Sequence, residues 1–497
     1  MSISGSSLPI RQISPWLVLA GLCTGLLVAM VNPLILLAVV VAVPLGAWAI
    51  SSVERALFAL IVVIGLLPRF ALPVQFGFTP TFLDLAMIGL ITAWVGRQLG
   101  RSPDMPLRRT LINGPLAAMI TTALLTFIIG LPNGALAPLV VRRFAELLLS
   151  LAMIAVIVAI TYNLAIHERA VRWMILVGAA SAALGIALYV MPDDLAIRLL
   201  SALRPFGYPS GPEVLRFIRD DPALMQRATG LWIDPNAYGG YLLVVGVLGL
   251  PQLFTPKPVM ARWLTFLALT LIVVALVLTV SRAAMLGFVF GALLIGLLRH
   301  RSALLILGLV GSAVLLLPQT QALVQHFVEG FQGRDLATQM RFGEYRDALR
   351  LIERYPLLGV GFVGTPDVDL YIGVSSMYLL IAQQMGVVGL AMFMITIGAV
   401  LLGAVRTWPA VSRTSPERAA FFLGAHGALV GALFSGIFDH YFFNIDFHNS
   451  VMLLCLLIGM AVSSQQGDTS LAEAQPMPRA DTPKYHLGRG DNFYGRA

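Results

Sequence analysis

Long apolar runs, separated by short polar stretches, follow one another from the start of the chain to about residue 463. A helix needs about 17–25 mostly apolar residues to cross the hydrocarbon core of a bilayer, so the pattern predicts an all-α bundle of about 12–14 transmembrane helices. Such continuous runs are not typical of a transmembrane β-barrel, whose strands alternate apolar and polar residues. The predicted spans are 16–31, 34–50, 56–67, 82–99, 114–131, 144–163, 173–191, 237–254, 263–280, 283–298, 303–318, 376–405, 419–438 and 449–463.

Charged residues make up 12% of the 497 residues, and hydrophobic residues 58%. Soluble domains carry roughly 25% charged residues, so this chain has too little charge to coat a soluble protein of its size. The net charge of +8 does not indicate nucleic-acid binding, because the chain has no basic run and no basic patch with interleaved aromatic residues. Cys23 and Cys455 are the only cysteines and both lie inside apolar spans, so neither a disulfide framework nor a metal cluster is expected.

Basic residues gather in alternate loops, after the fourth, sixth, eighth, tenth and twelfth spans. Short loops rich in Lys and Arg mark the cytoplasmic side of a membrane, so both termini are predicted to be cytoplasmic. The residues concerned are Arg97, Arg101, Arg108, Arg109, Arg169, Arg172, Lys257, Arg262, Arg299, Arg301, Arg406, Arg413 and Arg418.

Two long loops, 192–236 and 319–375, then face outward, and the second contains a helical pattern from Thr338 to Tyr355. From residue 464 onward the chain is rich in Gly, Pro, Gln and charges of both signs and has no apolar period. Residues 464–497 are therefore predicted to form a disordered cytoplasmic tail behind a transmembrane domain of residues 1–463.

The first outward motif is QRATGLWIDPNAYGGY, residues 226–241. Asp234, Pro235 and Asn236 are typical of a helix start, where Pro presets the backbone and Asp or Asn caps free amides. A simple turn accounts for these three residues, but it does not account for Arg227. The pair Gly239-Gly240 is predicted to allow close helix packing.

The second motif is TVSRAAMLG, residues 279–287, where two apolar spans meet almost without a loop. Arg282 lies at this joint, on the outward side. A charge at membrane depth usually faces a partner or a cavity, although a long side chain can also reach the interface by itself. The functional interpretation of Arg282 is an anion ligand.

The third motif is MRFGEYRDALRLIERYPLLGVG, residues 340–361. Arg346, Arg350 and Arg354 follow one helical face, which is consistent either with a solvated face paired to Glu or with ligand binding. Arg341 stands apart at the start. Pro356, Gly359 and Gly361 are predicted to end the helix.

The fourth motif is FDHYFFNIDFHN, residues 438–449, with Asp439, His440, Asp446 and His448 among aromatic residues that fit an interfacial belt. The spacing of the Asp and His residues matches no standard zinc motif, and no metal site is predicted.

Arginine suits phosphate because its planar fork donates paired hydrogen bonds and stays charged. Arg227, Arg282 and Arg341 come from three separate outward motifs. If they converge, they form a pocket for a diphosphate, whose charge must be neutralised when it leaves during sugar transfer.

The run from about Arg227 to Gly389 resembles the O-antigen ligase and O-antigen polymerase superfamily of bacterial membrane glycosyltransferases. The resemblance rests on the arginine before DPNAYGGYL, on SRAAMLG, and on RFGEYRDALRLIERYPLLGVG followed by SSMYLLIAQQMGVVGL, in this order. It implies an inner-membrane protein that transfers or polymerises glycans carried on undecaprenyl diphosphate at the periplasmic face, without a cofactor or an essential metal. Arg227, Arg282 and Arg341 take the arginine roles of the family, and Asp234, Asn236 and Arg346 are further candidates for substrate binding.

One position departs from the family. Its ligases usually carry His-Asn just before the Tyr-Leu of the third motif, where this chain has Ser375-Ser376 and then Met377. A serine hydroxyl has no pKa suited to a general base. The candidates to replace the missing imidazole are Asp367, Asp369, Asp439 and His440.

The leading hypothesis is therefore a repeat-unit polymerase for exopolysaccharide, capsule or O-antigen. The alternatives are a ligase that transfers glycan to lipid A core or protein, and a flippase or transporter for lipid-linked glycan. Transporters tend to carry broken helices and polar residues at mid-membrane, whereas the polar clusters here lie at one edge. The resemblance further implies partners for chain-length control and export.

Overall fold

The computed structural model describes residues 40, 44–73, 77–100, 105–316, 321–333, 336–367, 369–370 and 373–465. The span predicted at 16–31, most of the span at 34–50, Cys23, and the predicted tail from residue 466 onward lie outside these residues.

Helices make up nearly all of the regular structure in the described part of the chain, and a two-stranded antiparallel ribbon is its only named sheet. The ribbon consists of β1, Arg216–Phe217, and β2, Gln226–Arg227. The short 3-10 helices are η1, Leu131–Asn133; η2, Arg204–Phe206; η3, Pro212–Val214; η4, Ile218–Asp220; η5, Leu250–Leu253; and η7, Ile445–Phe447. The α-helices are α3, Val53–Leu66; α4, Phe82–Gln98; α5, Asn113–Gly130; α6, Pro138–Thr161; α7, Leu164–Val190; α8, Asp193–Ser201; α9, Pro235–Gly249; α10, Arg262–Leu278; α11, Arg282–Leu298; α12, Arg301–Leu316; α13, Gln321–Phe331; α14, Leu336–Arg354; α15, Met377–Thr414; α16, Pro416–Ser435; and α17, His448–Ser464.

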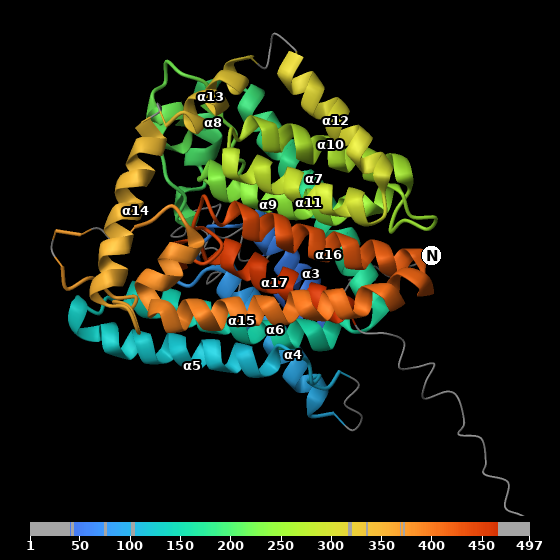
Figure 1. Ribbon diagram of the computed structural model, residues 1–497, viewed down its shortest axis with the longest axis horizontal. Coiled ribbons are helices and arrows are strands. Elements are labelled where there is room, and N and C mark those ends of the chain that lie inside the picture. Colours follow the sequence, from blue (N-terminus) through green and yellow to red (C-terminus); the bar gives the residue numbers. More distant parts are fainter. Residues whose placement is uncertain are drawn as a thin grey trace, which may run out of the picture.

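Six of the described helical segments are long and apolar enough to cross a membrane: Asn113–Asn133, Pro138–Thr161, Leu164–Val190, Met377–Thr414, Pro416–Ser435 and Ile445–Ser464. Two shorter apolar helices, α10 and α11, accompany them. In Figure 1 the apolar helices run side by side. The middle of the bundle contains α9, α16, α17, α3 and α6, while α13, α14 and α8 lie at one end. The prediction of an all-α polytopic bundle is confirmed.

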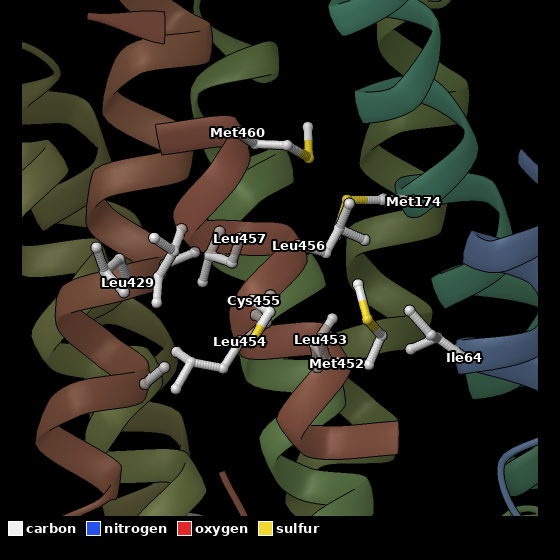
Figure 2. Close-up of a cluster of buried hydrophobic side chains, with 14 of the residues drawn as sticks. Ile64, Met174, Leu429, Met452, Leu453, Leu454, Cys455, Leu456, Leu457 and Met460 are labelled. Atoms are coloured by element: carbon white, nitrogen blue, oxygen red, sulfur yellow. The ribbon is translucent and has the colours of Figure 1, made fainter. Parts of the chain in front are cut away.

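The core of the bundle surrounds α17, most of whose residues are buried. Figure 2 shows its side chains between Ile64 and Met174 on one side and Leu429 on the other. Cys455 is buried and unpaired among these apolar side chains, as its position in the sequence predicts. The outer surface is apolar as well: Phe266 of α10 is 65% exposed and Leu309 of α12 is 72% exposed. Such a surface is suited to lipid rather than water.

Apart from α8, α13 and α14, successive helices cross the bundle in alternating directions (Figure 1), which gives it two ends. We call the end with the starts of α9, α11, α15 and α17 the site end, and the other the basic end. At the basic end Arg169 pairs with Glu54 at 2.8 Å, and Arg299 donates to the carbonyl of Ser412 at 2.9 Å. Arginines from several of the predicted basic loops therefore do lie at one end of the molecule.

The start of α15 is broken at Gly386, which has a φ of +67° that side chains other than glycine rarely adopt. The break frees the carbonyls of Gln383 and Gln384, which accept hydrogen bonds from the amides of Val360 and Gly361 at 2.9 Å each. The end of the third motif is thus docked onto α15. As predicted, α14 ends just before Pro356.

Candidate active site

Asp234 begins α9 at the site end. Its Oδ1 atom accepts from the amides of Asn236 and Ala237, at 2.9 and 2.8 Å, and Pro235 occupies the first turn. This is the predicted helix start. Ile233, just before the cap, has a φ of +64°. A β-branched residue with positive φ is strained, and such strain is found mostly at functional sites.

Arg227 ends β2 and lies beneath this helix start. Its Nε donates to the carbonyl of Thr279 at 2.8 Å, and its Nη2 donates to Oδ1 of Asn236 at 2.6 Å. Burial lowers the pKa of Arg227 to about 10, while Asp234 and Asp439 oppose this shift. The guanidinium group remains charged at neutral pH, and three of its five N–H bonds are not used by these two contacts.

The joint between α10 and α11 lies against the same helix. Val280 connects the two helices with a φ of +54°, a second strained β-branched residue at the site end. A Cβ at Gly239 would lie 2.9 Å from Ala284 and 3.0 Å from Ser281, so only glycine allows α9 to approach so closely. A Cβ at Gly240 would overlap with the ring of Tyr441. The predicted packing role of the glycine pair is confirmed.

Arg282 begins α11 and reaches toward the segments that follow α12. Its Nη2 lies 3.5 Å from Oγ1 of Thr338 on α14, and its guanidinium covers Gly330 of α13 so closely that a Cβ there would overlap with Nη1. Thr338 lies one helical turn before Arg341. Arg282 is therefore linked through this turn of α14 to Arg341, and through the joint to Arg227.

Arg341 faces the loop after α16. Its Nη2 lies 3.7 Å from Oδ2 of Asp439, and it also influences the pKa of Arg227. On the same helix Tyr345 donates to the carbonyl of Ser375 at 3.0 Å, and Glu344 accepts from the Ser375 hydroxyl at 2.6 Å. Ser375, in the stretch where the resemblance leads one to expect His-Asn, is thus hydrogen-bonded to the carboxylate of Glu344.

Asp439 is the carboxylate at the centre of this group. Its side chain is 6% exposed; Oδ1 accepts from the amide of His440, while Oδ2 is buried without a hydrogen bond. Burial raises the pKa of Asp439, and His440 and Arg341 oppose this shift. The carbonyl of Asp439 also accepts from the amide of Met377, which fixes it at the start of α15.

His440 is half-buried next to Asp439. Its Nδ1 lies 3.3 Å from Nδ2 of Asn444, which can only donate, and its ring lies 5.4 Å from that of Phe447. In the neutral imidazole this contact leaves the proton on Nε2.

Three predicted site residues lie apart from this group. Asp367 pairs with Arg354 at 2.8 Å, at the far end of α14 and thirteen residues from Arg341, which corresponds to about 20 Å of helix. Asp369 and Arg346 are exposed. The structure therefore brings Arg227, Arg341, Asp234, Asn236, Asp439 and His440 together, and Arg282 contacts Thr338 one turn from Arg341. Asp367, Asp369 and Arg346 lie apart from this group.

Two arginines near the site were not singled out from the sequence. Arg216 lies opposite Arg227 in the backbone register of the β-ribbon, so a second guanidinium lies close to the first. Asp221-Pro222, between the two short strands, is a turn signal in the sequence, but a turn alone does not predict that the flanking residues pair. Arg69 lies over the ring of Phe447 at 5.4 Å; burial lowers its pKa, while Asp234 opposes the shift.

The other two residues of the fourth motif belong to a neighbouring polar cluster, which Arg69 links to Asp234. Asp446 pairs with Arg143, and Nδ1 of His448 lies 4.0 Å from Oε2 of Glu146. Across the described residues, no group of three His, Cys, Asp or Glu side chains is placed to hold a metal ion.

The geometry joins cationic groups suited to a phosphorylated leaving group with a buried carboxylate suited to accept a proton. In comparisons with known proteins, the family model described as O-Antigen ligase matches residues 266–394, from within α10 to the first half of α15. The matched region includes Arg282 and Arg341, begins after Arg227 and ends before Asp439. A comparison with curated protein sequences gave no match.

Proposed function

From the place of this chain in the O-antigen ligase and polymerase superfamily, we propose that it is a polysaccharide polymerase. It joins oligosaccharide repeat units carried on undecaprenyl diphosphate, for exopolysaccharide, capsule or O-antigen. The observation that carries the proposal is the meeting of Arg341 with Asp439 beside Arg227.

We place the basic end of this multi-pass protein on the cytoplasmic side of the membrane, because short loops rich in basic residues prefer that side. The site end then faces outward from the bacterial inner membrane, where lipid-linked glycans are polymerised, and both termini are cytoplasmic. A bilayer carrying the lipid-linked glycan is thus the immediate partner. Machinery for length control and export is the further partner that the family implies.

The arginines bind the diphosphate of the donor. Arg227, Arg282 and Arg341 supply three positive charges from three elements, and Arg216 adds a fourth at the edge. As the bond between the anomeric carbon and the diphosphate oxygen breaks, the oxygen takes the electron pair. Positioned cations stabilise this developing charge more strongly in a partly buried site than in water.

Asp439 accepts the proton from the attacking sugar hydroxyl of the second lipid-linked repeat unit. That oxygen forms the new bond to the anomeric carbon, and the proton moves to Oδ2, the buried atom without a hydrogen bond. Because burial raises its pKa, this carboxylate is a stronger base than an ordinary aspartate. Ser375 is already hydrogen-bonded to Glu344, and its hydroxyl serves this bond rather than catalysis.

Replacing Arg282 by Ala tests the proposal. Polymer is expected to disappear while single lipid-linked repeat units accumulate, as seen by gel electrophoresis of the polysaccharide and mass spectrometry of the extracted lipids. Arg350, exposed on α14 and paired with Asp347, is the control position, and its change to Ala should leave polymer normal. Normal polymer in the Arg282 variant contradicts the assignment.

Ligation is the second candidate, because the matching family model is described as O-Antigen ligase. Loss of a ligase leaves long polymer on the carrier lipid, whereas loss of a polymerase leaves single repeats. Loss of a flippase would leave repeats facing the cytoplasm. The same lipid extraction therefore separates all three functions.

A further inference from the structure

A cavity of about 580 Å³ lies at the basic end, remote from the candidate site. Its wall combines the start of α3, the end of α4, the segment before α5, the α6–α7 turn and the start of α16. The charged and aromatic residues in this wall are Glu54, Arg97, Arg108, Tyr162, Arg169 and Arg418. Neither the family match nor the proposed reaction assigns it a role.

The cavity is strongly cationic, because four guanidinium groups face a single carboxylate among its described wall residues. Arg169 pairs with that carboxylate, Glu54, at 2.8 Å. The guanidinium carbon of Arg108 lies 3.9 Å from the ring centroid of Tyr162, and the Nε atom of Arg108 is buried without a hydrogen-bond partner. A cavity wall with this excess of positive charge attracts an anionic ligand.

The position of the cavity along the length of the bundle matches the level of a lipid headgroup. It touches Ala159, near the end of α6, and the 24 residues of α6 correspond to a length of about 36 Å. The cavity thus lies about one membrane thickness from the start of that helix.

Exposed leucines lie on the chain segments that supply the cavity wall, and Leu164, itself a wall residue, is 41% exposed. Leu99 is 83% exposed, Leu107 57% and Leu111 53%, and all three belong to the segments that carry Arg97 and Arg108. Apolar side chains on the segments of a cationic cavity suit a molecule with a phosphate and acyl chains, whereas a soluble anion gains nothing from the leucines.

We propose that this cavity binds the phosphate headgroup of an anionic phospholipid from the leaflet at the basic end. Arg108 donates to the phosphate while its ring contact with Tyr162 holds the guanidinium plane, and Arg97 and Arg418 complete the cationic wall. The acyl chains lie along the exposed leucines. This site is independent of the proposed polymerase activity, so either can fail without the other.

The experiment uses the full-length protein in nanodiscs of phosphatidylcholine with increasing phosphatidylglycerol. Thermal stability and lipid retention by native mass spectrometry are measured for wild type, for Arg108→Gln, and for Arg109→Gln. Arg109 is the exposed neighbour of Arg108 and does not line the cavity. A second arm adds inorganic phosphate to pure phosphatidylcholine discs.

Phosphatidylglycerol should stabilise the wild type and the Arg109 variant equally. Its apparent affinity should fall about tenfold in the Arg108 variant, as expected for the loss of one charge-assisted contact. Arg97→Gln provides a second variant in case the first folds poorly, and it should give the same loss. Equal affinity in all folded variants overturns the site, and an equal response to inorganic phosphate overturns the lipid as its ligand.

Discussion

Replacing Asp439 by Asn is expected to abolish polymerisation and at the same time to stabilise the folded protein. In the wild type, Oδ2 of Asp439 is buried without a hydrogen bond, an arrangement that costs about 1–3 kcal/mol. Its ion pair with Arg341 is long, at 3.7 Å, and the Arg341 side chain is 23% exposed. Such partly solvated pairs contribute about 0–1 kcal/mol, so the cost of the buried charge exceeds the gain.

The pH dependence of this effect has a definite sign. Burial raises the pKa of Asp439 above its usual value of 3.8, so the folded protein holds this proton more readily than the unfolded chain does. The ionised group therefore lowers stability, increasingly as the pH rises from about 3.8 through the raised pKa. The gain from asparagine should be full above that pKa and should shrink as the pH is lowered toward 4.

Two assays separate the consequences. We expect the melting temperature in detergent at neutral pH to rise by roughly 1–5 °C for a chain of this size. The initial rate of polymer formation from lipid-linked repeats should fall by about 10²–10⁴, the usual contribution of a general base. In the wild type the rate should rise with pH through the pKa of Asp439.

The control is Asp347→Asn, which alters a partly exposed carboxylate of α14 that is paired with Arg350. This variant should change neither the rate nor the melting temperature appreciably. If Asp439→Asn keeps the wild-type rate, then Asp439 is not the base. If the variant unfolds at a lower temperature than the wild type, then the buried charge of Asp439 does not lower stability.

Three further substitutions follow from the packing. Gly330→Ala places a Cβ onto the guanidinium of Arg282 and should reduce the amount of polymer at least about tenfold. Gly343 has open space around it, so Gly343→Ala should leave the amount of polymer unchanged. Equal amounts of polymer in the two variants would contradict the position given to Arg282. Gly240→Ala drives a Cβ into a buried aromatic ring and should destabilise the protein by about 1–3 kcal/mol, measured by thermal unfolding, and an unchanged melting temperature would contradict this packing. Asp367→Asn should keep at least about half of the polymerisation rate, because Asp367 pairs with Arg354 at the end of α14 remote from Arg341; a large loss of rate would restore Asp367 as a catalytic candidate.

The hydrophobic pattern predicted the helices well, because continuous burial in lipid and in the core requires long apolar segments. Several helices are longer than their predicted spans: α6 begins at Pro138 rather than at residue 144, α7 begins at Leu164 rather than at 173, and α15 ends at Thr414 rather than at 405. The additional turn of α6 contains Arg142, which pairs with Asp84 in a largely buried contact, and Arg143, which pairs with the half-exposed Asp446. Hydropathy cannot reveal a charge whose partner lies far away in the sequence.

The candidate site was predicted in part. Arg282 stood out because it is a charge at the joint of two apolar spans, where a charge is costly. Arg227 stood out because a simple turn does not account for it, and Arg341 because it stands apart at the start of the helical pattern. Arg346 lies apart from Arg341 because of helical phase: it follows Arg341 by five residues, about 140° around the helix, and is exposed. Buried Ala348 and Leu351 mark the face that Arg341 shares.

The choice between Asp367 and Asp439 could not be made from the sequence. Both are carboxylates in outward loops, and only the docking of α14 against the turn after α16 decides which one meets Arg341. That contact joins residues almost a hundred positions apart. No local pattern encodes it.

The most direct test is an experimental structure of the protein in a nanodisc with undecaprenyl diphosphate bound. The account predicts phosphate oxygens within hydrogen-bonding distance of Arg282 and Arg341, on the side of Arg227, with Asp439 facing the position of the sugar. A diphosphate bound at the basic end, or one that contacts none of these three arginines, would contradict it.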